Sequence, residues 1–226
     1  MPWPTPQEYN EAIQNPRANC SDPELAAGTP EVTALGLPRP VTGNFASVYR
    51  IRCGNRDWAV RCFWREYADM RQRYEAISRY LAALDLPYTV EFHYLERGIR
   101  IRGTWYPVLK MQWVDGVILS TWIEQHLNDR AALAEMAERW RTMMAALEHG
   151  GVAHGDLQHG NVMVARNELL LVDYDCMFVP ALSGKMSHEL GHQHYQHPRR
   201  AASDFGPGMD DFSAWVIYLS LLALSA

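Results

Sequence analysis

A short hairpin flanked by oxygen-bearing side chains is the feature that most constrains this chain. Asn161 opens an apolar run over 162–165, a polar turn follows at 166–168, and a second apolar run over 169–172 leads into Asp173. Two short apolar runs separated by a turn predict a β-hairpin. Its open ends would bring Asn161 and Asp173 close enough to share a cation. Because Mg²⁺ prefers a few hard oxygen ligands and keeps its waters, these side chains suit it.

The residues around the hairpin supply further functional groups. The run His154-Gly155-Asp156-Leu157-Gln158-His159-Gly160-Asn161 precedes it, and Asp173-Tyr174-Asp175 follows it. Phosphoryl transfer needs one carboxylate facing the attacking hydroxyl and oxygen ligands for magnesium ions that bridge the nucleotide phosphates. We therefore interpret Asp156 as the acceptor-facing residue and Asn161 and Asp173 as metal ligands. The alternative is that these side chains only cap turns.

Length and composition set the outer limits. The 226 residues are 48% hydrophobic, which is enough for one core or a two-lobed domain. A formal charge of −5 gives no reason to expect nucleic acid as a partner. Four scattered cysteines without a Cys-x-x-Cys pair favour reduced thiols and a cytoplasmic location. The apolar run 212–226 is shorter than the roughly 20 residues that span a bilayer, so we expect a buried helix and no membrane partner.

The order of predicted elements is strands, one helix, more strands, and then mostly helices. Residues 1–40 are rich in proline and predict an irregular N-terminal extension with one short helix over 8–13. Alternating strands are predicted over 45–51, 58–63, 89–95, 98–102 and 105–112. Apolar spacings of three and four predict helices over 65–84, 119–127 and 131–149.

Several runs of residues together carry a resemblance to a known family. They are Val41-Thr42-Gly43-Asn44-Phe45-Ala46-Ser47-Val48, Ala59-Val60-Arg61, Val108-Leu109-Lys110-Met111-Gln112-Trp113-Val114-Asp115-Gly116, the cluster around Asp156, Gly191-His192-Gln193-His194-Tyr195-Gln196-His197-Pro198 and Asp210-Asp211-Phe212-Ser213-Ala214-Trp215. Over roughly residues 38–226 the chain resembles the protein-kinase superfamily, in particular the Hanks-type Ser/Thr kinase-like domains of bacteria.

The resemblance implies an α+β, protein-kinase-like two-lobed fold. The N-lobe would be an antiparallel sheet plus one helix, and the C-lobe would be mostly helical and truncated or minimal. The extension would cover 1–40, the N-lobe and hinge 41–115, and the C-lobe 116–226, ending at a buried helix after the activation segment. In that helix, Asp211 would brace the backbone of the catalytic loop.

The resemblance also implies a nucleotide site. Val41, Gly43 and Val48 occupy the glycine-rich loop and its valine, although only one of the three loop glycines is present. Ala59 and Arg61 match the strand whose lysine grips the phosphates, with arginine in its place, and the two cations are not interchangeable at a fitted site.

The remaining positions carried over come from the predicted helix over 65–84, the hinge and the hairpin. Glu75 is the candidate partner of Arg61, with Glu66 a weaker one. Met111 would be the gatekeeper, and the backbone of Gln112 and Val114 would bond the adenine edge. Met163 would form the floor under the base. ATP and Mg²⁺ are the implied cofactors.

The catalytic loop departs from the commonest form of the family. Gly155 replaces the arginine after the histidine, and Gln158 replaces a lysine, so one positive charge beside the phosphates is lost. The His-Gly-Asp and Asp-Tyr-Asp forms are similar to the aminoglycoside and choline phosphotransferases. Asp175 would be a further metal ligand.

Three functions follow from these motifs. The favoured one is an ATP- and Mg²⁺-dependent phosphotransferase acting on Ser/Thr hydroxyls of a protein substrate. The alternatives are a pseudokinase, which acts as a nucleotide-binding or scaffolding module, and a small-molecule kinase. Nucleotide and a protein substrate or partner are the expected partners, without nucleic acid.

A competing motif lies further along the chain. His188-Glu189-Leu190-Gly191-His192 fits His-Glu-x-x-His, a zinc site that requires both histidines on one face of a helix. Lys185, Ser187 and Gly191 make a long helix there unfavourable. His194 and His197 add donors for an incidental metal between 188 and 197.

Overall fold

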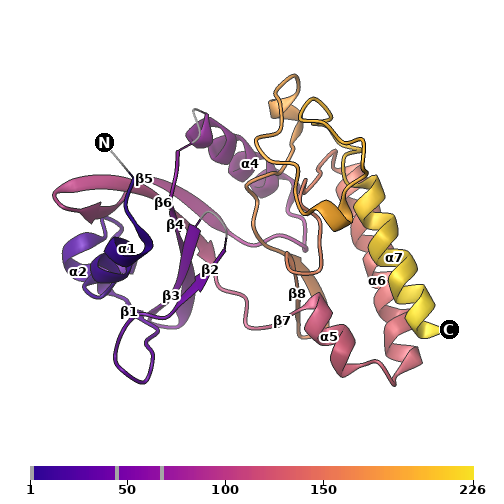
Figure 1. The fold of residues 1–226 in the computed structure, drawn as a ribbon, viewed down its shortest axis with the longest axis horizontal. Coiled ribbons are helices and arrows are strands. Elements are labelled where there is room, and N and C mark those ends of the chain that lie inside the picture. Colours follow the sequence, from indigo (N-terminus) through magenta and orange to yellow (C-terminus); the bar gives the residue numbers. More distant parts are fainter. Residues whose placement is uncertain (1–2, 44–45, 67–68) are drawn as a thin grey trace. The chain divides into compact units, whose positions relative to one another are not determined.

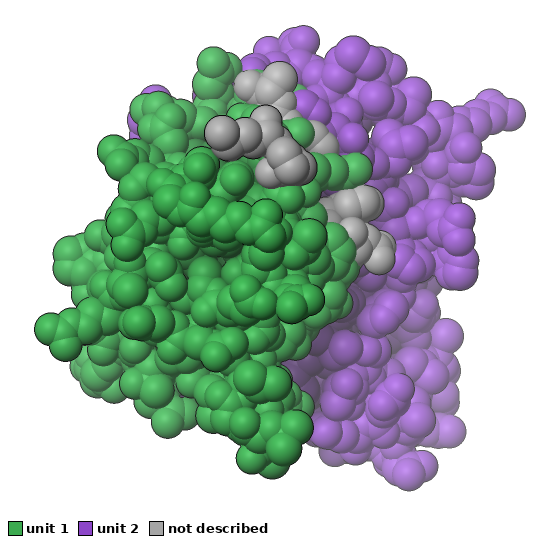
Figure 2. All heavy atoms as spheres, turned by 60° about the vertical axis from the view of Figure 1, so that its left-hand side comes forward, with its two compact units in different colours: residues 1–75, 91–113 green, residues 76–90, 114–226 purple. Residues whose placement is uncertain are grey.

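The chain forms two compact units in a computed structural model that describes residues 3–43, 46–66 and 69–226. Unit 1 contains residues 1–75 and 91–113, and unit 2 contains residues 76–90 and 114–226. Figure 1 traces the elements along the chain, and Figure 2 distinguishes the two units by colour. The α+β prediction is confirmed, since a sheet dominates unit 1 and helices dominate unit 2.

Unit 1 is built on an antiparallel six-stranded sheet. Its strand order is β1-β3-β4-β6-β5, and β2 also pairs with β3. The strands are β1 (Thr29–Pro30), β2 (Pro40–Thr42), β3 (Ala46–Cys53), β4 (Arg56–Phe63), β5 (Phe92–Ile101) and β6 (Thr104–Gln112). The two strands predicted over 89–102 form the single strand β5, whose pairing shifts register between Leu95 and Ile99.

The N-terminal segment is more regular than predicted. It contains three helices, α1 (Pro6–Ile13), α2 (Pro16–Asn19) and α3 (Pro23–Ala27). Each begins with a proline at the start of its first turn, preceded by a capping side chain from Thr5, Asn15 or Asp22. Proline is favoured at the first helical position because its missing N–H is not needed there. Three of the prolines that suggested an irregular extension, Pro6, Pro16 and Pro23, therefore mark helix starts.

These helices cover one face of the sheet. Tyr9, Ile13 and Leu25 are buried against a core cluster that includes Tyr49 and Trp58. The Tyr9 hydroxyl also donates to the carbonyl of Phe63, at 2.7 Å. Burial of this apolar surface makes the N-terminal segment an integral part of unit 1.

Lys110, on β6, anchors α3 to the same face. Its ammonium lies 3.0 Å from an oxygen of Asp22 and 2.7 Å from one of Glu24, and 4.4 Å from the ring centroid of Trp58. Burial alone would lower the pKa of Lys110, but hydrogen bonds from Glu24 and Asp22 outweigh it and the net direction is upward. The buried charge is therefore held in its protonated form.

Replacing Lys110 by methionine is expected to lower the free energy of unfolding by about 1–3 kcal/mol, because two carboxylates lose a charged hydrogen-bond donor. Glu24→Gln is the matched control, since the Glu24 side chain is 39% exposed and water can replace part of its interaction. Thermal unfolding of the two variants checks the prediction. Equal losses, or no loss in Lys110→Met, would contradict the anchoring role.

Helix α4 (Met70–Leu84) starts later than the predicted helix over 65–84, and the predicted position Tyr67 lies outside the described residues. Its residues 70–75 belong to unit 1 and the rest to unit 2. Tyr74 stacks on Tyr94 with ring centroids 5.5 Å apart and meets Phe92 edge to face. This aromatic group ties the start of α4 to the β5 side of the sheet.

Unit 2 combines a three-stranded sheet, in the order β7-β8-β9, with longer helices. Its elements are β7 (Val117–Ile118), α5 (Leu119–Gln125), α6 (Arg130–His149), β8 (Val162–Ala165), β9 (Glu168–Leu171), two 3-10 helices, η1 (Pro180–Leu182) and η2 (Gln193–Tyr195), and α7 (Asp211–Ser225). The predicted helices over 119–127 and 131–149 correspond to α5 and α6.

Helix α7 is buried along one face only. It packs beside α6 (Figure 1), where Ser213, Ile217 and Leu221 are buried and the Trp140 indole donates to the Ala214 carbonyl. Trp215 and Leu219 are 59% and 55% exposed. The expectation of a buried helix was thus only partly right, because an apolar sequence does not tell which face is covered. Among the described residues, no helix is both long and apolar enough to cross a membrane.

Candidate active site

The predicted hairpin of unit 2 is confirmed. Strands β8 and β9 pair with Val162 opposite Leu171, and the amide of Val172 donates to the Asn161 carbonyl at 3.0 Å. The turn residues Arg166 and Asn167 both have positive φ, 51° and 69°. Two such residues define the turn type whose twist matches paired strands. The hairpin therefore places Asn161 beside the residue that precedes Asp173.

The Asn161 side chain is fixed by Asp156. Its amide nitrogen donates to the Asp156 carbonyl oxygen at 2.8 Å and to the carboxylate oxygen Oδ2 at 2.9 Å. Both hydrogens of the amide are thereby directed toward Asp156, and no donor among the described residues bonds the amide oxygen. That oxygen is the atom a cation would contact, as expected for a metal ligand.

Asp156 accepts hydrogen bonds on both carboxylate oxygens. The backbone amide of His192 donates to Oδ1 at 2.6 Å, and Gln158 Nε2 lies 3.4 Å from Oδ2. Gly191 has φ of +75°, and a Cβ there would lie 2.8 Å from Asp156 Oδ1. The segment 191–192 therefore positions the Asp156 carboxylate, a contact that the sequence did not predict.

The charges of four carboxylates reach the buried Cys176 thiol. Burial raises the pKa of the Cys176 thiol, and the charges of Asp175, Glu189, Asp156 and Asp173 raise it further. All four carboxylates thus act on one buried sulfur atom. Asp173 has φ of +66°, a conformation that aspartate tolerates better than most residues and that is concentrated at functional sites.

Asp210, and not Asp211, braces the backbone at residues 154–155. The buried Asp210 carboxylate accepts the backbone amides of His154 and, at 2.9 Å, of Gly155, while Asp211 is exposed in the first turn of α7. Burial raises the pKa of Asp210, against the opposing effects of His154 and the two amides. The prediction of Asp211 was wrong because two adjacent aspartates at a helix start look equivalent, and only the helix boundary distinguishes them.

Gly155 is required by the local backbone, which accounts for the missing arginine. Its φ is +80°, and a Cβ would lie 2.2 Å from the Cys176 carbonyl oxygen and 2.7 Å from the Met209 side chain. The Gly155 carbonyl also accepts from the Arg200 guanidinium at 2.8 Å. No side chain fits at this position without moving the backbone.

The substitution Gly155→Ala is expected to lower the free energy of unfolding by about 2–4 kcal/mol. The loss has two causes, because alanine is strained in a left-handed conformation and its Cβ would overpack the Cys176 carbonyl. Gly206→Ala is the matched control, because a Cβ there meets open space, and it should stay within about 0.5 kcal/mol of the wild type. Urea unfolding checks both. An unaffected Gly155→Ala variant would show that this backbone is not constrained.

Tyr174 anchors the Asp-Tyr-Asp motif within unit 2. Its buried hydroxyl donates to the Leu171 carbonyl at 2.8 Å and accepts from the Val90 amide at 2.9 Å. His154 Nε2 lies 2.9 Å from the Val172 carbonyl. Burial raises the pKa of Tyr174. These bonds fix the backbone on both sides of Asp173 and explain the use of tyrosine, whose hydroxyl phenylalanine lacks.

Five of the residues predicted to contact the nucleotide lie on one face of the sheet in unit 1. Directly opposed residues of antiparallel strands share a face. Val41, Val48, Arg61 and Leu109 are successive cross-strand partners, and Arg50, Ala59 and Met111 form the adjacent row. The register therefore brings Val41, Val48, Ala59, Arg61 and Met111 onto one continuous surface, opposite the face covered by α1.

Glu75 has a different partner from the predicted one. Its carboxylate accepts from Arg71 Nε at 2.7 Å, one helical turn earlier, and Arg71 also binds Glu96 at 2.8 Å. Within the described part of the chain no ion pair joins Glu75 to Arg61. A basic residue four positions away on the same helix is a nearer partner than one on a strand.

The backbone groups of the predicted hinge are partly engaged. The Gln112 amide donates to the Glu91 carbonyl at 2.8 Å, and the Val114 carbonyl accepts from Gly116 at 3.1 Å. The Gln112 carbonyl and the Val114 amide are thus the backbone groups of the hinge that could bind a ligand.

Gly43 donates its amide to the Ala46 carbonyl at 3.1 Å, and the loop positions 44–45 lie outside the described residues. Met163 pairs with Leu170 and Ile118.

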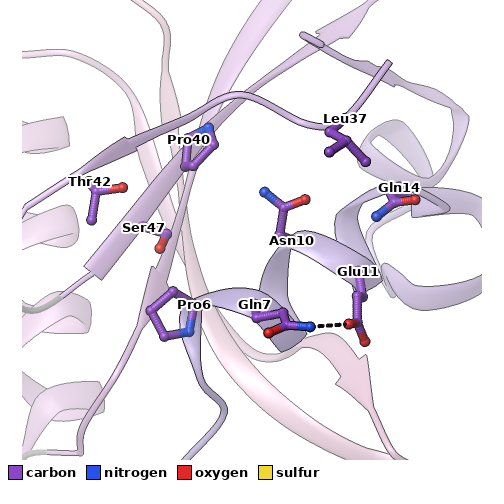
Figure 3. A pocket seen from close by; sticks show the side chains of 9 residues that line it. All are labelled: Pro6, Gln7, Asn10, Glu11, Gln14, Leu37, Pro40, Thr42 and Ser47. Atoms are coloured by element: carbon purple, nitrogen blue, oxygen red, sulfur yellow. Dashed lines mark hydrogen bonds between the residues drawn. The ribbon is translucent and has the colours of Figure 1, made fainter. Parts of the chain in front are cut away.

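A groove of about 430 Å³ lies elsewhere in unit 1. Figure 3 shows its lining, with Asn10 and Glu11 from α1 and Gln14 just after α1 on one side, and Thr42 from β2 and Ser47 from β3 on the other. Thr42 and Ser47 are cross-strand partners one position away from Val41 and Val48. Because successive residues of a strand point to opposite faces, the groove is on the other side of the sheet from the predicted nucleotide surface.

The expectation that residues 188–192 do not form the helix of a zinc site is confirmed. These residues form no helix, and η2 begins only at Gln193. The rings of His192 and His194 meet edge to face at 5.1 Å, and His159 Nδ1 bonds the Tyr195 hydroxyl. Nowhere in the described ranges do three or more His, Cys, Asp or Glu side chains form a group able to hold a metal ion.

The two units and their loops define a protein-kinase-like fold. A search of solved structures supports this class, and among the matches is the Cydia pomonella granulovirus kinase PK-1, with a TM-score of 0.62. That chain is 15% identical in sequence, and the match covers 88% of this chain and 69% of that chain. No protein-family model and no curated protein sequence matches the chain.

Proposed function

We propose that the protein is an ATP- and Mg²⁺-dependent phosphotransferase, most similar in design to Ser/Thr protein kinases of the Hanks type. The observation that carries the proposal is the arrangement of Asn161, whose amide nitrogen is held by Asp156 and whose oxygen is left for a cation. Magnesium supplies charge neutralisation at the phosphates in such reactions. Asn161 and Asp173 would hold it, with Asp175 as a further ligand.

The remaining residues bind and position the reactants. Asp156 would orient the acceptor hydroxyl and take its proton, because it is the carboxylate bonded to the metal ligand Asn161. Val48, Ala59 and Met111 would contact the base from the shared face of the sheet, and Arg61 would contact the phosphates. The favoured acceptor is a Ser/Thr hydroxyl of a protein, since segment 191–198 resembles the activation segment of that branch.

A pseudokinase is the second candidate. Two observations favour it. The Asp156 carboxylate already accepts hydrogen bonds from the His192 amide and the Asn161 side chain, and Glu75 pairs with Arg71. Such a protein would bind nucleotide as a scaffold without transferring phosphate. The small-molecule kinase remains a variant of the first proposal with a different acceptor.

A transfer assay with radiolabelled ATP separates these functions. The intact protein is incubated with Mg²⁺ and either a Ser/Thr peptide library, an aminoglycoside or choline. Label in the peptides supports the protein kinase, and label in a small molecule supports the alternative acceptor. No label in any acceptor, together with magnesium-dependent nucleotide binding, would replace the proposal by the pseudokinase.

A further inference from the structure

The far end of the β5–β6 hairpin carries an exposed basic cluster. Arg97 and Arg100 lie with their guanidinium carbons 5.6 and 5.7 Å from the ring centroid of Trp105, which is directly opposite Arg100 across the strands. Arg100 also donates to the Ala18 carbonyl at 3.1 Å, so the guanidinium group of Arg100 contacts the backbone of α2, the helix that carries Arg17. We call Arg17, Arg97, Arg100 and Trp105 the hairpin cluster.

The arginines of the hairpin cluster have no acidic partner. Among the described residues, no carboxylate lies within ion-pair distance of Arg17, Arg97 or Arg100, and all three side chains are exposed. Two acidic residues near this end of the hairpin bind other arginines. Glu96 binds Arg71 at 2.8 Å, and Glu8 binds Arg102 at 2.5 Å. Three positive charges therefore gather at one site on a chain whose net charge is −5.

We propose that the hairpin cluster docks an acidic, Asp/Glu-rich segment of a partner protein. Guanidinium groups bind carboxylates through paired hydrogen bonds and keep their charge at all relevant pH values. Stacking on Trp105 holds two of them in defined orientations before binding, which lowers the entropy lost on association. The proposal does not depend on the phosphotransferase function.

The geometry favours a peptide carrying several carboxylates over other anions. The edge of β5 is covered, because Cys20 bridges Ile99 and Ser21 donates to the Gly98 carbonyl, so the contact is made by side chains. Nucleic acid would need an open aromatic surface for base stacking, whereas the Trp105 ring is half-buried and packed against two guanidinium groups.

Fluorescence anisotropy of the full chain tests the proposal. The probe is a labelled oligoglutamate peptide, and its glutamine counterpart is the uncharged control. We expect salt-dependent binding of the glutamate peptide alone, weakened about ten-fold by R97Q/R100Q. The matched variant R79Q/R130Q removes the same charge from exposed sites elsewhere and should bind like the wild type. Arg17→Gln, which breaks no hydrogen bond of the folded unit, should weaken binding by a smaller factor, and it keeps the test valid if the double variant unfolds.

Three results would overturn the proposal. The first is the absence of peptide binding at low ionic strength. The second is equal weakening by R97Q/R100Q and R79Q/R130Q, which would reduce the effect to net charge. The third is tighter, Arg97- and Arg100-dependent binding of a single-stranded oligonucleotide or of anionic lipid vesicles, which would assign the hairpin cluster to a different partner.

Discussion

Replacing Asp156 by asparagine is expected to lower the rate of phosphoryl transfer by about 10²–10⁴-fold, the range that general-base groups contribute. The carboxylate accepts from the His192 amide on one oxygen and from Asn161 on the other. An asparagine offers only one acceptor atom, so its amide nitrogen would face a donor. The substitution therefore removes the proton acceptor and also disturbs the orientation of Asn161. Radiolabel transfer, with thermal unfolding to verify the fold, measures the effect.

Substitutions at His192 provide the matched control for this prediction. His192→Ala keeps the backbone amide that binds Asp156 and is expected to retain most of the transfer activity. His192→Pro removes that N–H and is expected to reduce activity. If the Asp156→Asn variant keeps its activity, the assigned role of Asp156 is contradicted. If the two His192 variants have equal effects, the support of Asp156 by the His192 amide is contradicted.

Replacing Asp210 by alanine is expected to lower the free energy of unfolding by about 2–6 kcal/mol. The substitution leaves the amides of His154 and Gly155 buried without an acceptor, and each such group costs about 1–3 kcal/mol. The backbone would lose its support at Gly155, the residue preceding Asp156. Urea unfolding of the purified variant measures the loss.

The neighbouring aspartate is the control for Asp210. Asp211 is exposed in the first turn of α7, so Asp211→Ala should change stability by no more than about 1 kcal/mol through the helix dipole. Asp210→Asn should fall between the two, since it keeps one acceptor oxygen. A larger loss in Asp211→Ala than in Asp210→Ala would reverse the assignment made from the hydrogen bonds.

Local patterns predicted the centre of unit 2 well. The hairpin around Asn161 follows from two short apolar runs and a polar turn. Its two strands pair residues that are close in sequence. The long helix α6 follows from its apolar spacing in the same way. The hydrogen bonds between Asn161 and Asp156 were not predicted, although the two residues are close in sequence.

Features set by distant contacts were missed. Glu75 could not be assigned from spacing, because its choice between Arg71 and Arg61 depends on where α4 lies on the sheet. The need for glycine at position 155 arises from the Cys176 carbonyl, and the amide that positions Asp156 comes from His192. The N-terminal helices were missed for a different reason, since proline both breaks helices and starts them.

The magnesium dependence of ATP binding tests the central claim most directly. The intact protein and its Asp173→Asn variant are titrated with ATP by calorimetry, with Mg²⁺ and with EDTA. We predict that the wild type binds ATP only, or far more tightly, with Mg²⁺, and that the variant loses at least about ten-fold in affinity because one metal ligand becomes neutral. Absence of binding by the wild type, or identical titrations with and without Mg²⁺, would contradict the account.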